Sequence, residues 1–140
     1  MIREAELLAM PIDAYMNGVQ QAFFRQRLLD ERAELQDRIE EKFGRLRESE
    51  YFSDLADQGS AEEQRRWQLR LLERQKKLLD KVDEALERLG RNEYGWCSET
   101  GEPIGLHPLL LRPTASLCIE AKERLEQRER HTPDRGSLNG

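Results

Sequence analysis

The sequence has few of the residues that build disulfide scaffolds, metal centres or nucleophilic active sites. It contains two cysteines and two histidines in 140 residues, too few for a disulfide framework or for a four-thiolate zinc site. It also shows no glycine-rich phosphate loop and no serine, histidine and aspartate set. We therefore expect a protein that is not an enzyme and that holds no metal or other cofactor.

Long apolar runs are missing as well. Hydrophobic residues make up 37%, aromatic residues 6% and charged residues 36% of the chain, whereas globular domains average about 45–50% apolar and about 25% charged. One core enclosing the whole chain is therefore not expected. No segment approaches the roughly 20 apolar residues that span a bilayer, and residues 1–6 lack the pattern of a signal peptide. We expect a cytoplasmic protein with no membrane association.

The charge is acidic overall and unevenly distributed. The net charge is −5, whereas proteins that bind nucleic acid through phosphate contacts are normally basic, so direct sequence-specific DNA binding is not expected. Residues 48–63 carry six acidic and no basic side chains, and residues 65–81 carry seven basic and two acidic ones. These blocks are either solvated helix faces or an acidic end that enters a basic cavity.

Hydrophobic spacing predicts two long helices. The first runs from about residue 14 to residue 49, and its seam contains Leu28, Leu35, Ile39 and Leu46. After a bend over residues 50–59, Ser60 and Glu63 form a capping-box pattern that predicts the start of the second helix. Its heptad seam contains Leu71, Gln75, Leu78, Val82, Ala85 and Leu89. Gly90 is expected to end it.

A pair of half-complete knuckles follows these helices. Cys97 with Thr100 and Cys118 with Ala121 have the spacing of two C-x-x-C pairs, which would predict structural zinc if all four were cysteine. Threonine is a poor zinc ligand and alanine has no donor atom. Three interpretations remain: zinc with His107 as a third ligand, a Cys97–Cys118 disulfide, or two buried thiols in a fold that has lost its metal. We favour the last, because packing can replace the metal through Tyr94, Trp96, Ile104, Leu106, Leu109, Leu110, Leu117 and Ile119.

The predicted fold is mainly all-α. Neither helical stripe is stable in water alone, so the two long helices should fold back as an antiparallel coiled-coil hairpin with its tip near residues 52–60; a plain oligomerisation coil is the alternative. A third helix is expected from Leu117 to about residue 130, with Ser116 as its cap. The predicted parts are an N-terminal piece of the globular domain (1–15), the hairpin (16–91), a degenerate zinc-finger-like domain with the C-terminal helix (92–131) and a flexible tail (132–140).

Several separated motifs resemble the DksA/TraR family. The cysteine segment of that family is matched by residues 94–97 (Tyr-Gly-Trp-Cys), 101–105 (Gly-Glu-Pro-Ile-Gly), 111–115 (Leu-Arg-Pro-Thr-Ala) and 117–119 (Leu-Cys-Ile). Residues 14–17 resemble the start of its first long helix, and Asp54 and Asp57 match the Asp-x-x-Asp at its hairpin tip. The resemblance spans residues 14 to about 130. The missing ligands make the chain similar to the zinc-independent members of the family.

The resemblance implies a function in transcription. Members bind RNA polymerase, not DNA, and their coiled coil enters the secondary channel. There they shorten the lifetime of open promoter complexes, acting with guanosine tetraphosphate in the stringent response. The resemblance thus predicts a monomer whose partners are RNA polymerase and this nucleotide. The runner-up functions are a Gre-type transcript-cleavage factor and a coiled-coil interaction protein unrelated to polymerase.

The resemblance also assigns roles to individual residues. The family's tip motif is Asp-x-x-Asp-x-Ala, and here Gly59 stands in the alanine place after Asp54 and Asp57. Arg74 aligns with a basic residue on the polymerase-facing side of the second helix. The places of the family's nucleotide contacts are taken by Leu78, Lys81, Arg112 and Lys122. These cations are far apart in sequence, so they would converge only if the globular part packs beside the base of the rod.

Overall fold

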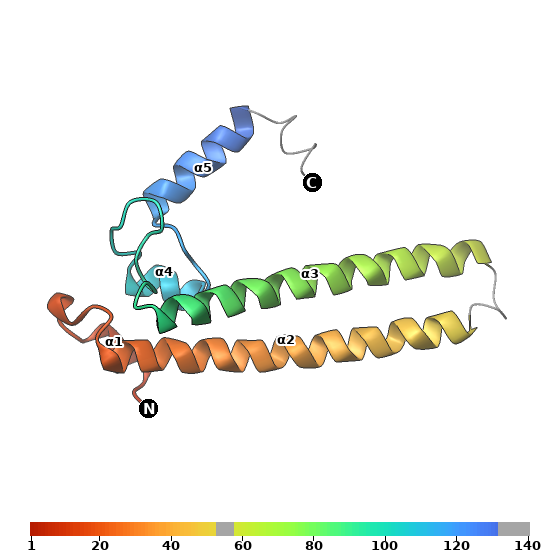
Figure 1. The fold of residues 1–140 in the computed structure, drawn as a ribbon, viewed down its shortest axis with the longest axis horizontal. Helices are drawn as coiled ribbons and strands as arrows, with labels where there is room; N and C mark the ends of the chain where they lie inside the picture. Colours follow the sequence, from red (N-terminus) through yellow and green to blue (C-terminus); the bar gives the residue numbers. More distant parts are fainter. Residues whose placement is uncertain (53–57, 132–140) are drawn as a thin grey trace.

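Two long helices and a small helical base make up the molecule (Figure 1). The computed structural model describes residues 1–52 and 58–131, with the side chains of residues 49–52 and 58–60 left out. The elements are α1 (Glu4–Leu8), the 3-10 helix η1 (Ile12–Ala14), α2 (Gly18–Phe52), α3 (Gln58–Gly90), α4 (Leu106–Leu111) and α5 (Ile119–His131). The tip residues Asp54 and Asp57 and the tail 132–140 lie outside the described residues. No helix in the described part has both the length and the apolarity that a membrane crossing requires.

Helix α2 begins at a reciprocal side-chain cap. The Asn17 Oδ1 atom accepts a hydrogen bond from the Gln20 N–H at 2.9 Å, and the Gln20 Oε1 atom accepts one from the Met16 N–H at 2.8 Å. Together these bonds satisfy backbone donors that the helix end leaves free. Gln20 is 1% exposed, so the cap is part of the interior. The helix therefore starts a turn later than the predicted residue 14.

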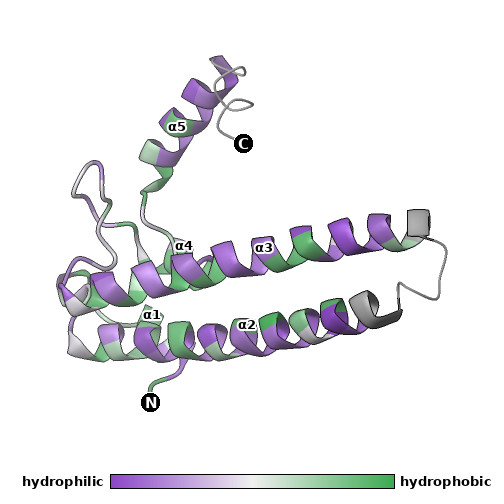
Figure 2. Cartoon of the chain, turned by 45° about the vertical axis from the view of Figure 1, so that its right-hand side comes forward, coloured by the Kyte–Doolittle hydropathy of each residue, from purple (hydrophilic) through white to green (hydrophobic). Residues whose placement is uncertain are grey.

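The antiparallel hairpin is confirmed. Helices α2 and α3 run side by side (Figures 1 and 2), and the Arg32 Nε atom lies 2.7 Å from the Asp83 Oδ1 atom across the pair. In α2 the predicted seam residues Leu28, Leu35 and Leu46 are buried and Ile39 is half-buried.

The seam of α3 differs from the prediction by one residue at two places. Leu72 and Leu79 are the buried or half-buried members of their leucine pairs, whereas Leu78 is 41% exposed. The observed seam follows Leu72, Gln75, Leu79, Val82, Ala85 and Leu89, and Leu86 is half-buried beside it. In each pair, Leu71 with Leu72 and Leu78 with Leu79, either residue fits the same 3-4 spacing. In the structure Leu72 and Leu79 face α2. The prediction that Leu78 lies in the seam is wrong.

The apolar seam weakens toward the tip. The contiguous core cluster reaches Leu35 on α2 and Leu79 on α3. Beyond this level the α3 seam contains Gln75 and Gln68, whose Oε1 atoms are buried without a hydrogen-bond partner in the described part of the chain. Buried apolar side chains reappear at Leu72, outside the main cluster. The base half of the rod is thus packed more tightly than the outer half.

Helix ends are predicted less well than helix existence. Helix α3 ends at Gly90 as predicted, but it starts at Gln58, so Ser60 lies inside its first turn and the predicted cap is wrong. Serine and glutamate are tolerated within helices, so Ser-x-x-Glu does not by itself mark a start. Ser116 is not the cap of α5, because the helix starts at Ile119. The Ser116 carbonyl instead accepts a hydrogen bond from the Ser98 N–H at 2.9 Å.

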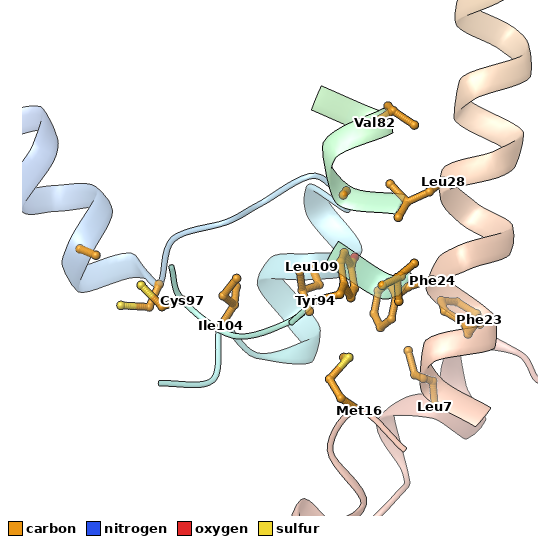
Figure 3. Packing of buried hydrophobic residues seen from close by; sticks show 14 of the residues in the cluster. Leu7, Met16, Phe23, Phe24, Leu28, Val82, Tyr94, Cys97, Ile104 and Leu109 are labelled. Atoms are coloured by element: carbon orange, nitrogen blue, oxygen red, sulfur yellow. The ribbon is translucent and has the colours of Figure 1, made fainter. Parts of the chain in front are cut away.

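The core of the molecule sits at the base of the rod (Figure 3). It joins all five α-helices and the 91–118 segment through Leu7, Met16, Phe23, Phe24, Leu28, Leu35, Val82, Ala85, Leu89, Tyr94, Cys97, Ile104, Leu109, Cys118 and Ala121. Tyr94, Ile104 and Leu109 are buried as predicted. Trp96 at 37% and Ile119 at 63% exposure are not, so the prediction that these two replace the metal is wrong. Helix α5 then leads away from the rod (Figures 1 and 2).

Candidate functional site

The first knuckle is a tight backbone turn around Cys97. The Cys97 N–H donates to the Glu102 carbonyl at 2.7 Å, and the Gly101 N–H donates to the Cys97 carbonyl at 2.9 Å. An isolated antiparallel bridge between Trp96 and Pro103 closes its base. Gly101 has φ 74°, a conformation that glycine adopts without the penalty of a side chain. Backbone hydrogen bonds therefore form the frame of this turn.

The second knuckle meets the first at the start of α5. Cys118 precedes the helix, and its carbonyl accepts a hydrogen bond from the Lys122 N–H at 3.0 Å. The Thr100 Oγ1 atom lies 3.8 Å from the Cys118 Sγ atom. Zinc–sulfur bonds of about 2.3 Å in a tetrahedron place sulfur atoms about 3.8 Å apart. The frame therefore retains the spacing of a metal site.

The donor atoms do not fit a four-thiolate zinc site. Cys97 and Cys118 are free, buried thiols, so the disulfide is not formed. Thr100 supplies a hydroxyl that accepts a hydrogen bond from the Glu102 N–H at 3.2 Å, and Ala121 fills the fourth place with a methyl group that is fully buried. In the described ranges no three or more His, Cys, Asp or Glu side chains lie together in a group that could hold a metal. His107, the other suggested ligand, is exposed on α4.

Hydrogen bonds dominate the electrostatics of the Cys97 thiol. Burial acts to raise its pKa. Bonds from the Thr100 hydroxyl and from the backbone N–H groups of Cys118, Thr100 and Glu99 outweigh that effect and lower the pKa to about 6. Hydrogen bonds to a charged form favour that form. The knuckle thus stabilises a thiolate without a metal.

Two tyrosine hydroxyls fix the knuckle segment, one from the residues just before α2 and one from within the segment itself. The Tyr15 hydroxyl donates to the Gly95 carbonyl at 2.6 Å and accepts from the Gly105 N–H at 2.9 Å. The Tyr94 hydroxyl donates to the Pro113 carbonyl at 2.7 Å, and burial raises the pKa of Tyr94. A Cβ atom on Gly95 would lie 2.8 Å from the Met16 Cγ atom, so this approach requires glycine. Sequence reasoning missed the role of Tyr15, because its partners lie 80 and 90 residues away.

The basic residues expected to bind the nucleotide lie on three elements that meet at the base. Lys81 is on α3, Arg112 directly follows α4, and Lys122 is in the first turns of α5; all three side chains are exposed. Helix α4 lies close to the C-terminal end of α3 (Figure 1), and the Tyr94 bond holds Pro113, the neighbour of Arg112. The predicted packing of the globular part beside the base of the rod is confirmed.

The other residues assigned by resemblance lie along α3. Leu78 is 41% exposed, three residues before Lys81, and Arg74 is exposed one turn further toward the tip. Gly59 lies in the first turn of α3. Their roles, like those of the cations, stay predictions.

Comparison with known proteins gives consistent matches along most of the chain. Residues 20–89 match the N-terminal domain of DnaK suppressor protein DksA, and residues 92–127 match the prokaryotic dksA/traR C4-type zinc finger. The RNA polymerase-binding transcription factor DksA of Caulobacter vibrioides is 45% identical over 119 residues, 84% of each chain. The protein of the same name in Escherichia coli K12 is 35% identical over 121 residues, 86% of this chain and 80% of that one.

A solved structure agrees with these sequence matches. Transcription factor DksA2 from Pseudomonas aeruginosa superposes with a TM-score of 0.86 at 70% sequence identity, covering 92% of this chain and 100% of that one. The match includes both the hairpin and the base. Because both family domains match, curated relatives are 35–45% identical and the three-dimensional structure is shared, the chain belongs to the DksA/TraR family.

Proposed function

We propose that this chain is a cytoplasmic transcription factor that binds RNA polymerase as a monomer. Its hairpin enters the secondary channel and destabilises open promoter complexes, together with guanosine tetraphosphate in the stringent response. The observation that carries the proposal is the match to both the rod and the base of the family, in a chain whose curated relatives are named RNA polymerase-binding factors. The protein acts by binding and is not an enzyme.

The dimensions of the rod support this proposal. Helices of 35 and 33 residues are each about 50 Å long at 1.5 Å per residue. Such a rod holds the acidic block of residues 48–63 at the end far from the base. A deep channel in the polymerase would receive that end. The base remains outside and holds the cations of the proposed nucleotide site.

The nucleotide site is proposed to comprise Leu78, Lys81, Arg112 and Lys122, completed by a polymerase surface. Cations gathered at one end of a molecule repel one another, so stability alone does not account for them. A nucleotide with two diphosphates would neutralise them, with Arg112 able to form bidentate bonds and the lysines acting as point charges. The free protein should then bind the nucleotide weakly.

Independence from zinc is the second part of the proposal. It is supported by the donor set, since Ala121 offers no ligand atom and the Thr100 hydroxyl is already hydrogen-bonded. The apolar cluster that includes Cys97, Cys118 and Ala121 supplies the cohesion that a metal gives to a four-cysteine finger. The folded base is therefore expected to persist in a chelator.

The deciding experiment is in vitro transcription from a ribosomal RNA promoter, with open-complex lifetime measured with and without guanosine tetraphosphate. The wild type should shorten the lifetime, and more so with the nucleotide. Asp54→Asn/Asp57→Asn should lose the effect while retaining polymerase binding. An unchanged lifetime with wild-type protein would contradict the proposal; cleavage of backtracked RNA would instead indicate a Gre-type factor, and failure to co-purify with polymerase an unrelated interaction protein.

The nucleotide site has its own test in the same assay. Each charge-assisted contact contributes about 1.5–3 kcal/mol, so Arg112→Ala or Lys122→Ala should weaken the nucleotide's effect about tenfold or more. Inhibition without nucleotide should survive. Lys76→Ala, which removes another exposed cation of α3, is the control. Dose–response curves that overlay the wild type would refute the assignment.

A further inference from the structure

A tryptophan on α3, Trp67, is exposed and packs against no other aromatic ring of the described residues. Trp67 is 60% exposed and lies about 14 Å along the helix from Gln58, at 1.5 Å per residue. The other tryptophan, Trp96, packs edge-on against Tyr15 with ring centroids 5.3 Å apart. Among the described residues, Trp67 makes no ring–ring or cation–ring contact. Its indole is therefore available to a partner.

Trp67 begins a continuous stripe along α3. Spacings of four and three residues place on one helix face Trp67, Leu71, Arg74, Leu78 and Lys81. Leu78 is 41% exposed and Leu71 is half-buried. The seam against α2 follows Leu72 and Leu79 instead, so the stripe runs beside the seam and faces outward. We call these five residues the α3 stripe.

Between Trp67 and Lys81 the charges nearest the α3 stripe are basic, while the exposed Glu63 lies one turn before Trp67 on the same face. The cations Arg66, Arg70, Arg74, Lys77 and Lys81 are all exposed. Within the described part of the chain no ion pair engages any of them. At about 100° per residue, Glu73 and Asp80 lie about 120–140° around the helix from Trp67. The stripe is thus apolar at its centre and basic at its margin.

This pattern is that of a docking surface for an acidic partner. Tryptophan and arginine are the residues most enriched among binding hot spots, where an apolar anchor is surrounded by polar contacts. A second copy of the chain is a poor occupant, because a symmetric dimer through this face would bring its cations against one another. The complementary surface has carboxylates around an apolar depression.

We propose that Trp67 is the anchor of the docking face, inserting into an apolar depression with an acidic margin on RNA polymerase. The proposal rests on the proposed function and specifies which face of the rod contacts the enzyme. Because Trp67 lies on the outer half of the rod, this contact sets how deeply the hairpin enters the polymerase and how it is rotated about its long axis. Arg74 and Lys81 continue the same line toward the base.

The test is the affinity of variants for purified core polymerase, measured by biolayer interferometry. Trp67→Ala should raise the Kd at least tenfold. Leu69→Ala is the control, since Leu69 is 39% exposed on the same helix two residues away and should change the Kd less than about twofold, as a contact outside the face would. Circular dichroism should show unchanged helicity and melting, because the Trp67 side chain is exposed.

Charge substitutions provide the second measurement. With an acidic margin opposite, Trp67→Lys should retain more affinity than Trp67→Glu, and the affinity of both should fall with salt. Equal affinities of Trp67→Ala and wild type, or a reversed order of the charged variants, would overturn the proposal while leaving polymerase binding intact. Wild type that does not bind polymerase would refute the proposed function as well. A wild-type dimer that Trp67→Ala converts to monomer, without loss of polymerase affinity, would overturn the proposal in favour of a self-association face.

Discussion

Replacing Tyr15 with phenylalanine isolates the hydroxyl that joins the knuckle segment to the residues just before α2. The ring and its edge-on contact with Trp96 remain, so packing is preserved. Two hydrogen bonds are lost, one to the Gly95 carbonyl and one from the Gly105 N–H. The consequences at the two partners differ, because the Gly95 carbonyl also accepts from the Ile104 N–H at 2.8 Å.

The expected cost follows from that difference. The Gly95 carbonyl keeps a partner, so the loss of its bond to Tyr15 should cost about 0.5–1 kcal/mol. The Gly105 N–H is left without a partner, so the loss of its bond should cost about 1–2 kcal/mol. The free energy of unfolding should therefore fall by about 2 kcal/mol, which for a chain of this size lowers the Tm by roughly 6–8 °C. Tyr94→Phe, which removes the single bond to Pro113, should cost about half as much.

Urea unfolding measures the total loss of stability, and amide hydrogen exchange measures the loss of the Gly105 hydrogen bond by itself. Unfolding reports the total, and the Gly105 amide should change from protected to fast-exchanging in Tyr15→Phe. If the variant stays within about 0.5 kcal/mol of wild type, the typical range for neutral surface changes, and Gly105 stays protected, the hydroxyl does not hold the knuckle segment to the residues before α2.

Two further predictions concern the knuckles. Thr100→Cys/Ala121→Cys should create a zinc site: elemental analysis should find about one zinc per chain and chelator should lower the Tm, whereas wild type should hold far less zinc and keep its melting curve; a metal-free double variant would contradict the frame geometry. For Cys97, with a folded-state pKa of about 6 against an ordinary 9.0, unfolding takes up a proton between these values. Stability should therefore rise from about pH 6 to pH 9 and be lost as pH falls through 6, and Cys97→Ser should flatten the profile; ultraviolet thiolate absorbance checks this, and titration at an ordinary thiol pKa would count against it.

The sequence predicted what depends on local pattern. The hairpin, the buried residues Leu28 and Leu35 and the end of α3 at Gly90 follow from hydrophobic spacing and helix termination. It did not decide between Leu78 and Leu79, because adjacent leucines satisfy the same repeat equally well. Only the position of α2 resolves that choice, and it leaves Leu78 exposed.

The candidate site depended more on distant contacts. The donor deficit at Ala121 was readable from spacing alone, and so was the placement of Cys97 and Cys118 in a zinc-finger frame. The Tyr15 bonds and the convergence of α4 and α5 on the base were not readable, because they join segments whose separation in sequence carries no periodic signal. Helix α4 itself was hidden in a segment rich in turn residues.

The weakening seam gives the rod a gradient of local stability. An ion pair between Arg32 and Asp83 joins α2 to α3 in the base half, whereas the pair of Glu41 with Arg45 in the outer half lies within α2 and does not join the two helices. With Gln75 and Gln68 in its seam, the outer half should open at a lower free energy than the base, as separate cooperative units do. A partner that binds the outer rod can therefore bend or separate its helices without disturbing the core.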